Sequence, residues 1–238
     1  MRKIQLVLVA LIVLILSAFK ADHVITIYMI GDSTMSNKPL EGNNQERGWG
    51  HVLGSFFTED VRVENHAMNG RSSKSFIDEG RWETVVNKIR PGDYVFIQFG
   101  HNDEKPQPER HTDPGTTFDE NLRKFVRETR AKGGIPVLFN SIVRRNFGVN
   151  PDAVAADDIR PEKDEAVVEG DTLIDTHGKY LESPRNVAKE MDVCFIDLNQ
   201  ATKKLVESYG VEGSKKLFMW IPADTYAACP KGRQDNTH

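Results

Sequence analysis

The amino-acid sequence predicts a three-layer α/β/α sandwich around a mainly parallel sheet of five strands. Three observations support this prediction. Short β-branched apolar runs alternate with amphipathic stretches, which is the order of a parallel sheet whose crossovers are helices. The composition is that of a globular protein, with 39% hydrophobic and 28% charged residues. The length of 238 residues suits one sizeable core, and no internal repeat or second domain is visible.

The five expected strands are short apolar runs, each bounded by Gly, Asp or Pro. Runs of this length and composition are typical of buried strands. Because they are largely apolar, we expect helices to cover both faces of the sheet. The predicted strands are 24–30, 61–65, 94–99, 135–139 and 193–197.

Two helices are predicted by apolar side chains at helical spacing. The first runs from 118 to 132, begins with two acidic residues and is stopped by Gly133 and Gly134. Acidic residues near the N-terminus and glycine after the C-terminus both favour a helix with these ends. The second helix runs from 198 to 209 and ends before Gly210.

Two polar stretches interrupt the alternation. Residues 104–117 carry three prolines directly after a strand, which predicts a long surface loop. Residues 150–171 hold eight acidic and two basic side chains. Because runs of charge are usually solvated, we interpret this stretch as a solvated insertion and not as a binding site.

Residues 1–21 have the pattern of a secretory signal peptide, which leaves 22–238 as the domain. Arg2 and Lys3 precede an unbroken apolar run at 6–16. A short membrane anchor is the alternative, but the run is too short for a hydrocarbon core of roughly 30 Å. We therefore expect a secreted or periplasmic protein with no stable membrane partner.

Charge and cysteine content exclude further classes. Without residues 1–21 the chain keeps 28 basic and 35 acidic side chains, a balance of minus 7, which disfavours non-specific nucleic-acid binding. Cys194 and Cys229 could form a disulfide in an exported protein or be two small buried residues. Their spacing does not resemble a zinc site. The expected protein is a monomer.

Polar clusters follow three of the predicted strands, at 31–34, 69–72 and 100–103. Ligands of an open parallel sheet bind outside the carboxyl ends of its strands. We therefore expect the three clusters to lie together at one edge of the sheet.

Each cluster by itself has a structural explanation. Ser33 could cap a helix, Gly70 could be a turn glycine, and Asn102 and Asp103 could bond within their own loop. Together they fit a catalytic site better. A hydroxyl nucleophile needs a general base, a carboxylate that orients the base, and hydrogen-bond donors where negative charge develops.

His238 is the preferred general base among the seven histidines. Asp235 precedes it by three residues, so on a tight turn the carboxylate can accept the Nδ1 proton and leave Nε2 facing Ser33. The context of His101 suggests a loop or substrate contact instead, and the sequence places no other histidine in such a pair. A polar tail that happens to end in histidine is the alternative.

Four ordered blocks carry a family resemblance: 31–35 (GDSTM), 69–73 (NGRSS), 100–103 (GHND) and 235–238 (DNTH). They resemble the blocks of the SGNH, or GDSL, hydrolases, which implies a flavodoxin-like α/β fold. The finer motifs Gly48-Trp49-Gly50, Arg81-Trp82 and the Asn-Thr-His ending look most like the rhamnogalacturonan acetylesterases. The resemblance covers the chain after residue 21.

The resemblance implies a role for each matching residue. Ser33 would be the nucleophile, His238 the general base, and Asp235 the carboxylate that fixes its tautomer. The backbone N–H groups of Ser33 and Gly70 and the side-chain amide of Asn102 would form the oxyanion hole.

The resemblance also implies a substrate. The enzyme would remove acetyl groups from a plant cell-wall polysaccharide, with the rhamnogalacturonan of pectin as the first candidate. It would need no metal or organic cofactor. Substrate contacts would come from Asp32, His101, Asp103 and Arg71.

The sequence departs from the family at its end. In this family the Asp-x-x-His block is ordinarily followed by more chain, commonly a helix that packs on the sheet, whereas His238 is the last residue here. The domain 22–238 is therefore expected to lack a C-terminal element. A free carboxylate on His238 would favour the protonated imidazole, so we expect a chain extended beyond it to be more active and more stable.

Three alternatives stay open from the residues. The enzyme could deacetylate xylan or another glycan, or the protein could be a carbohydrate-binding relative with impaired catalysis, because a fold does not establish an activity. Gly31-Asp32 and residues 100–103 also echo the ligands of a metallophosphoesterase. That alternative is remote because no Asp-x-His pair precedes the first block.

A galacturonate polymer is anionic, so a negatively charged protein would bind it through a local basic patch. The candidates are Arg71, Lys74, Arg144 and Arg145. The three tryptophans could stack on sugar rings, but we expect at least two of them to lie in the core.

Overall fold

The structure is a computed structural model. It describes residues 24–41, 44–148, 170, 172–227 and 229–238. The predicted signal peptide lies outside these residues, as does the acidic stretch 150–171 apart from residue 170. Among the helices of the described residues, none has the length and apolar character needed to cross a membrane.

Five parallel strands form the central sheet in the order β2-β1-β3-β4-β7. Strand β1 lies in the interior of the sheet, with β2 on one side and the later strands on the other, so the strand order reverses between β1 and β3. All five predicted strands are confirmed, and no end differs from the prediction by more than one residue. The strands are β1 Ile25–Gly31, β2 Val61–Asn65, β3 Tyr94–Gln98, β4 Ile135–Phe139 and β7 Cys194–Ile196.

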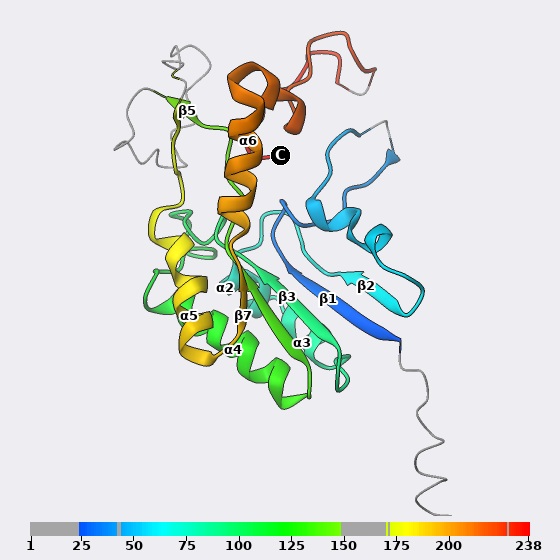
Figure 1. Ribbon diagram of the computed structural model, residues 1–238, viewed down its shortest axis with the longest axis vertical. Coiled ribbons are helices and arrows are strands. Elements are labelled where there is room, and N and C mark those ends of the chain that lie inside the picture. The colour runs from blue at the N-terminus through cyan, green and yellow to red at the C-terminus, as the bar shows by residue number, and fades with distance from the viewer. Residues whose placement is uncertain (1–23, 42–43, 149–169, 171, 228) are drawn as a thin grey trace, which may run out of the picture.

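Four helices cover one face of the sheet, on the side away from the viewer in Figure 1. They are α2 Ser73–Asp78, α3 Arg81–Val86, α4 Thr117–Ala131 and α5 Glu182–Met191. Alternate strand side chains such as Ile30, Ile97 and Leu138 pack against them in the larger core. The alternation follows from the two-residue period of a strand, which sends neighbouring side chains to opposite faces.

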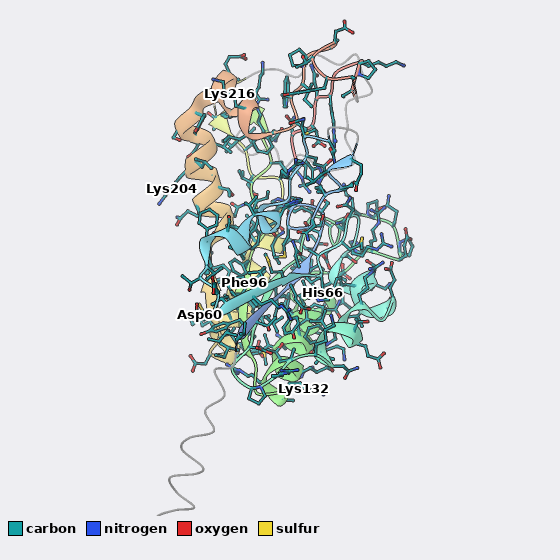
Figure 2. The ribbon with its side chains drawn as sticks, turned by 90° about the vertical axis from the view of Figure 1, so that its right-hand side faces the viewer. Asp60, His66, Phe96, Lys132, Lys204 and Lys216 are labelled. Atoms are coloured by element: carbon teal, nitrogen blue, oxygen red, sulfur yellow. The ribbon has the colours of Figure 1, made fainter. Side chains whose placement is uncertain are left out.

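Short helices and α6 lie on the other side. The 3-10 helices η2 Trp49–His51 and η3 Leu53–Phe56 accompany a smaller core around Met29. Figure 2 places Phe96 of β3 and Lys204 of α6 on this side of the molecule. Helix α6 is Leu198–Gly213, followed by η5 Ser214–Leu217. The remaining helix, η4 Gly178–Leu181, precedes α5, and its Tyr180 packs against the larger core.

The two helices predicted from spacing are confirmed as α4 and α6. After α4, Gly133 has a φ of +77°, a left-handed value that glycine adopts at little cost. Within α6, Gly210 has a φ of 65° and a ψ of −178°, so the helical path breaks at the residue where it was predicted to end. The predicted loop 104–117 contains turns and reaches the start of α4.

A two-stranded antiparallel sheet was not predicted. It pairs β5 Phe147–Gly148 with β6 Thr172–Leu173. Strands of two residues are too short to show a period, so the sequence carries no signal for them.

The cysteines fit neither expected alternative. Cys194 is exposed, Cys229 is partly exposed, and both are free thiols. The tryptophans follow the prediction: Trp82 is 2% exposed in the larger core, and Trp49 packs against the smaller one.

Candidate active site

Ser33 lies on the turn that follows β1, at the carboxyl edge of the sheet. The carbonyl oxygen of Asp32 accepts hydrogen bonds from the backbone N–H groups of Met35 and Ser36, at 3.3 and 3.1 Å. These bonds close a tight turn around the serine. Ser33 itself is partly exposed, while the residues on both sides of it are buried.

Gly31 is required by close packing of the backbone. A Cβ atom at this position would lie 2.6 Å from the carbonyl oxygen of Gln98 in the neighbouring strand. That separation is well below van der Waals contact, and a backbone oxygen cannot rotate away. The glycine of the first block therefore lets β1 and β3 approach directly beneath the serine.

His238 and Asp235 form the predicted pair. Nδ1 of His238 lies 3.1 Å from Oδ2 of Asp235, and Nε2 of His238 lies 2.8 Å from Oγ of Ser33. The other carboxylate oxygen accepts from the backbone N–H groups of Thr237 and His238, at 2.8 and 3.1 Å. The carboxylate thus fixes both its own turn and the imidazole.

Asp235 is held in its charged form. Burial alone would raise the pKa of Asp235, but the hydrogen bonds from His238 and the backbone of Thr237, with that from Arg233, lower the pKa well below its usual range. A charged carboxylate at Nδ1 favours the tautomer in which Nε2 can accept the proton of Ser33.

The segment that carries this pair is tied to two others, around Met219 and at Arg145, by backbone hydrogen bonds and one side-chain hydrogen bond. Asp235 N–H donates to the carbonyl of Met219 at 3.2 Å, and the N–H of Met219 donates to the carbonyl oxygen of His238. The N–H of Arg145 donates to Asn236 at 2.7 Å, and the indole N–H of Trp220 donates to the Asn236 side chain at 2.9 Å. The role of Trp220 had no sequence signal.

The second block lies beside Ser33. The N–H of Met68 donates to the carbonyl of Gly31 at 2.9 Å, and Oγ of Ser36 contacts both the Ser33 carbonyl, at 3.3 Å, and Oδ1 of Asn69, at 2.7 Å. Gly70 follows with a φ of +74°, a left-handed conformation in which a glycine is favoured.

The third block joins the second through Asn102. Its side-chain Nδ2 donates to the carbonyl of Arg71 at 3.1 Å. One amide hydrogen is engaged by this bond, and a primary amide has a second one to offer. The structure therefore brings the predicted nucleophile, base, carboxylate and amide donors to one edge of the sheet.

Asp32 belongs to a buried network beneath Ser33. Its Oδ1 accepts from the backbone N–H and the hydroxyl of Thr34, at 2.9 and 2.7 Å. Gln98 donates to Thr34 at 3.0 Å and accepts from the indole N–H of Trp49 at 2.7 Å. Burial raises the pKa of Asp32, which is fully enclosed by protein.

Asp103 supports the loops of the second and third blocks. Its carboxylate accepts from the backbone N–H groups of Ser73 and Gly100, at 3.0 and 3.1 Å, and from the hydroxyl of Thr112 at 2.9 Å. Burial raises the pKa of Asp103 to about 7 in spite of these donors. The residue is 0% exposed.

One group of described residues has the composition of a metal site. It comprises His101, Glu104 and His177, whose ligand atoms lie within 4.8 Å of one another. The guanidinium of Arg144 already pairs with Glu104, and the ring nitrogens of His177 contact Glu104 and the Ile142 carbonyl, each at 3.0 Å. A buried guanidinium in the group opposes a divalent cation, so the cluster fits an internal ion-pair network better.

Three predicted substrate contacts are corrected by burial. Asp32, His101 and Asp103 are 0%, 3% and 0% exposed, so their side chains face protein, and the two carboxylates accept bonds from their own loops. We assign them to positioning. Burial, with His177 and Arg144 nearby, lowers the pKa of His101 well below its usual range.

The predicted basic patch is not assembled. Arg144 and Arg145 are 6% and 5% exposed and bond within the protein. Lys74 donates to the carbonyl of Pro108. Arg71 is one-third exposed and pairs with Glu79 at 3.0 Å, so its role in substrate binding stays a prediction.

A cavity of about 230 Å³ lies beside His238. Its walls are mostly apolar and come from the loop around Trp49, from α6 and from η5, with side chains that include Val52, Leu205 and Phe218. The imidazole is thereby flanked by apolar surface on one side.

A serine hydroxyl in contact with a histidine and a carboxylate, at the carboxyl edge of a parallel sheet, has the arrangement of a serine hydrolase of the α/β class. The sequence comparison assigns the family. Residues 29–212 match the GDSL-like lipase/acylhydrolase family, and the chain belongs to it. The protein is a carboxylic ester hydrolase, and the metallophosphoesterase alternative is not supported.

Individual relatives extend this similarity. The chain is 40% identical over 214 residues to rhamnogalacturonan acetylesterase RhgT of Bacillus subtilis (strain 168), covering 90% of this chain and 82% of that protein. It is 31% identical over 219 residues to the probable rhamnogalacturonan acetylesterase YesY of the same organism, covering 92% and 85%. The crystal structure of protein YxiM from Bacillus subtilis superposes with a TM-score of 0.65 at 27% identity, covering 82% of this chain and 49% of that one.

Proposed function

We propose that the protein removes acetyl groups from an acetylated polysaccharide, with Ser33 as the nucleophile. The observation that carries the proposal is the double contact of His238, whose ring nitrogens lie 2.8 Å from the Ser33 hydroxyl and 3.1 Å from the Asp235 carboxylate. A histidine bonded on both sides in this way can take the serine proton and keep the resulting charge stabilised.

Acylation follows from this geometry. Oγ of Ser33 attacks the carbonyl carbon of the acetyl ester while its proton moves to Nε2 of His238. The tetrahedral intermediate carries a negative oxygen, which the N–H groups of Ser33 and Gly70 and the amide of Asn102 stabilise. The bond from carbon to the sugar oxygen then breaks, and His238 gives its proton to the departing hydroxyl.

Deacylation repeats the sequence with water. His238 takes a proton from the water molecule that attacks the acetyl group on Ser33. A second tetrahedral intermediate forms at the same donors and collapses with cleavage of the bond to Oγ. The proton on His238 returns to Oγ of Ser33, and the product leaves as acetic acid, which loses its proton to solvent and becomes acetate.

The proposed polysaccharide is the rhamnogalacturonan of pectin. Support comes from the two relatives named above, which match this chain over most of their own length. Arg71 is the proposed contact for an anionic sugar, because its partly exposed guanidinium lies in the same loop as Gly70.

The test is acetate release from a panel of polymers. Acetylated rhamnogalacturonan and acetylated xylan are offered to the wild-type protein and to Ser33→Ala, each with and without EDTA. The proposal expects faster release from rhamnogalacturonan, no release by Ser33→Ala, and no effect of EDTA. Faster release from xylan would overturn the substrate, and an active Ser33→Ala would overturn the mechanism.

Export and a monomeric state belong to the same proposal. The basis for export is the pattern of residues 1–21, and the proposed substrate is a polymer. N-terminal sequencing of protein recovered from the culture medium or periplasm should begin near residue 22. Sedimentation equilibrium should give a mass of one chain.

A further inference from the structure

Arg233 links the proposed catalytic pair to a second carboxylate. Its Nη2 donates to Oδ2 of Asp235 at 2.6 Å, and its Nη1 donates to Oε2 of Glu46 at 2.8 Å. Oδ2 is also the oxygen that contacts Nδ1 of His238. The guanidinium therefore shares one carboxylate oxygen with the imidazole.

Glu46 has a further cation on its other side. Nζ of Lys38 lies 2.5 Å from Oε1 of Glu46, and the two side chains are 1% and 13% exposed. Burial alone would raise the pKa of Glu46, but the hydrogen bonds from Lys38 and Arg233 outweigh burial and lower it. A buried charge of this kind persists because oppositely charged and hydrogen-bonding partners surround it.

The same lysine reaches the loop of the predicted oxyanion hole. Nζ of Lys38 donates to Oδ1 of Asn69 at 2.7 Å, and Asn69 directly precedes Gly70. Alternating charges thus connect this loop to the catalytic pair: Lys38, Glu46, Arg233 and Asp235. The sequence positions lie far apart, since Glu46 and Arg233 are separated by 187 residues.

We propose that Arg233 is a positioning residue which, held in place by Glu46 and Lys38, fixes the Asp235 carboxylate and sets the proton affinity of His238. The proposal rests on the proposed role of His238 as general base. Arg233 contacts neither Ser33 nor His238, so it acts through Asp235.

The two members of the Arg233–Glu46 pair act on His238 in opposite directions. A positive guanidinium near the imidazole disfavours a second positive charge there, whereas the Glu46 carboxylate favours it. The other charged or titratable groups that bear on His238 are Asp235 and the main-chain carboxylate expected on His238 itself, Asp32 after β1, His101 after β3, and Arg47, which lines the same cavity. Substitutions at 233 and 46 leave all of these groups in place.

The experiment compares Arg233→Met, Arg233→Lys and Glu46→Gln with the wild type. The midpoint of His238 protonation is followed by NMR of its ring carbon-bound protons, and kcat/KM for 4-nitrophenyl acetate is measured over the same pH range. Arg233→Met should raise the NMR midpoint and the acidic limb of kcat/KM by about 0.5 to 1 pH unit. Arg233→Lys should restore most of the wild-type value, and Glu46→Gln should lower the midpoint.

Arg123→Met is the matched control. Arg123 forms an ion pair with Glu190 at 2.8 Å between α4 and α5, with a side chain that is 25% exposed against 35% for Arg233. It lies on the face of the sheet covered by α2 to α5, so loss of its charge should leave the His238 midpoint unchanged. Melting temperatures of all variants report on folding.

Two results would overturn the proposal: an unchanged midpoint in folded Arg233→Met, or shifts of the same sign in Arg233→Met and Glu46→Gln. Glu46→Gln could leave Lys38 without its carboxylate and fail to fold. In that case Arg233→Met and Arg233→Lys are sufficient to test whether Arg233 sets the His238 midpoint. A wild-type protein that hydrolyses no ester would refute the proposed function instead, while the NMR midpoints would still report on the charge coupling.

Discussion

Nε2 of His238 lies 2.8 Å from Oγ of Ser33, although 205 positions separate the two residues in the sequence. Each is held by its own backbone contacts. Ser33 lies on a tight turn at the end of β1, and His238 lies on a segment that bonds to Met219 and to Arg145. In Figure 1 the end marked C lies on the side of the molecule to which the carboxyl end of β1 points. The site therefore depends on docking of the last described segment onto the edge of the sheet.

Asp235→Asn should lower kcat for ester hydrolysis by about 10⁴-fold. The amide keeps the shape of the side chain but no longer stabilises the imidazolium, and it favours the wrong tautomer of His238. Steady-state kinetics with 4-nitrophenyl acetate measures the effect, and circular dichroism checks the fold. A variant within tenfold of the wild type would contradict the assigned role of Asp235.

Asn102→Ala should lower kcat by about 10²-fold with little change in KM. The amide is expected to contact the oxyanion, which exists only in the transition state and intermediates, so its loss affects the chemical step more than binding. The same substitution removes the bond to the Arg71 carbonyl. A rise in KM at constant kcat would instead assign Asn102 to substrate binding.

Asp103 should make stability depend on pH between about 4 and 7. Its pKa is raised to about 7 in the folded protein, so the folded state binds this proton more tightly than the unfolded state. The stabilisation that comes from protonated Asp103 is complete below the pKa of this residue in the unfolded state, and it is lost as the pH rises through 7.

The check on Asp103 is the melting temperature of the wild type and of Asp103→Asn at pH 5 and pH 7.5. Because the asparagine does not titrate, the melting temperature of the wild type should exceed that of Asp103→Asn by more at pH 5 than at pH 7.5. If the melting temperature of the wild type instead exceeded that of Asp103→Asn by more at pH 7.5, the Asp103 carboxylate would be charged and stabilising throughout this range.

Gly31→Ala should destabilise the protein by about 1 to 3 kcal/mol, because the added methyl group meets the carbonyl of Gln98. Gly54→Ala is a suitable control, since a Cβ there would have its nearest contact at 3.8 Å, on Val63. Urea unfolding of both variants gives the two free energies of unfolding. Equal free energies of unfolding for Gly31→Ala and Gly54→Ala would mean that β1 and β3 can move apart with little loss of stability.

The sequence predicted the fold because its signals are local. The strands other than β2 are apolar runs bounded by residues that disfavour strands, and α4 has acidic residues at its start and glycines at its end. In β2 two valines alternate with Arg62 and Glu64. The polar blocks after β1 and β3 could be placed at one edge because all the strands are parallel. The short pair β5 and β6 has no comparable signal, since a strand of two residues shows no period.

The site was only partly predictable, and burial explains the difference. The order of the four motifs along the sequence identified Ser33, Asp235 and His238, and these three side chains contact one another in the structure. It did not distinguish side chains that face the site from those beneath it, so Asp32, His101 and Asp103 were expected to contact the substrate.

The sequence by itself determined where the five strands lie along the chain, the two amphipathic helices and the residue types available for ester hydrolysis. Only the tertiary structure decided which charges surround the catalytic pair. Lys38 and Glu46 belong to one loop, whereas Arg233 lies 187 residues beyond Glu46, and each has an ordinary surface explanation when considered alone. Folding buries Lys38 and partly buries Glu46 and Arg233 beside one another, and a charge withdrawn from water is tolerated where an opposite charge lies beside it.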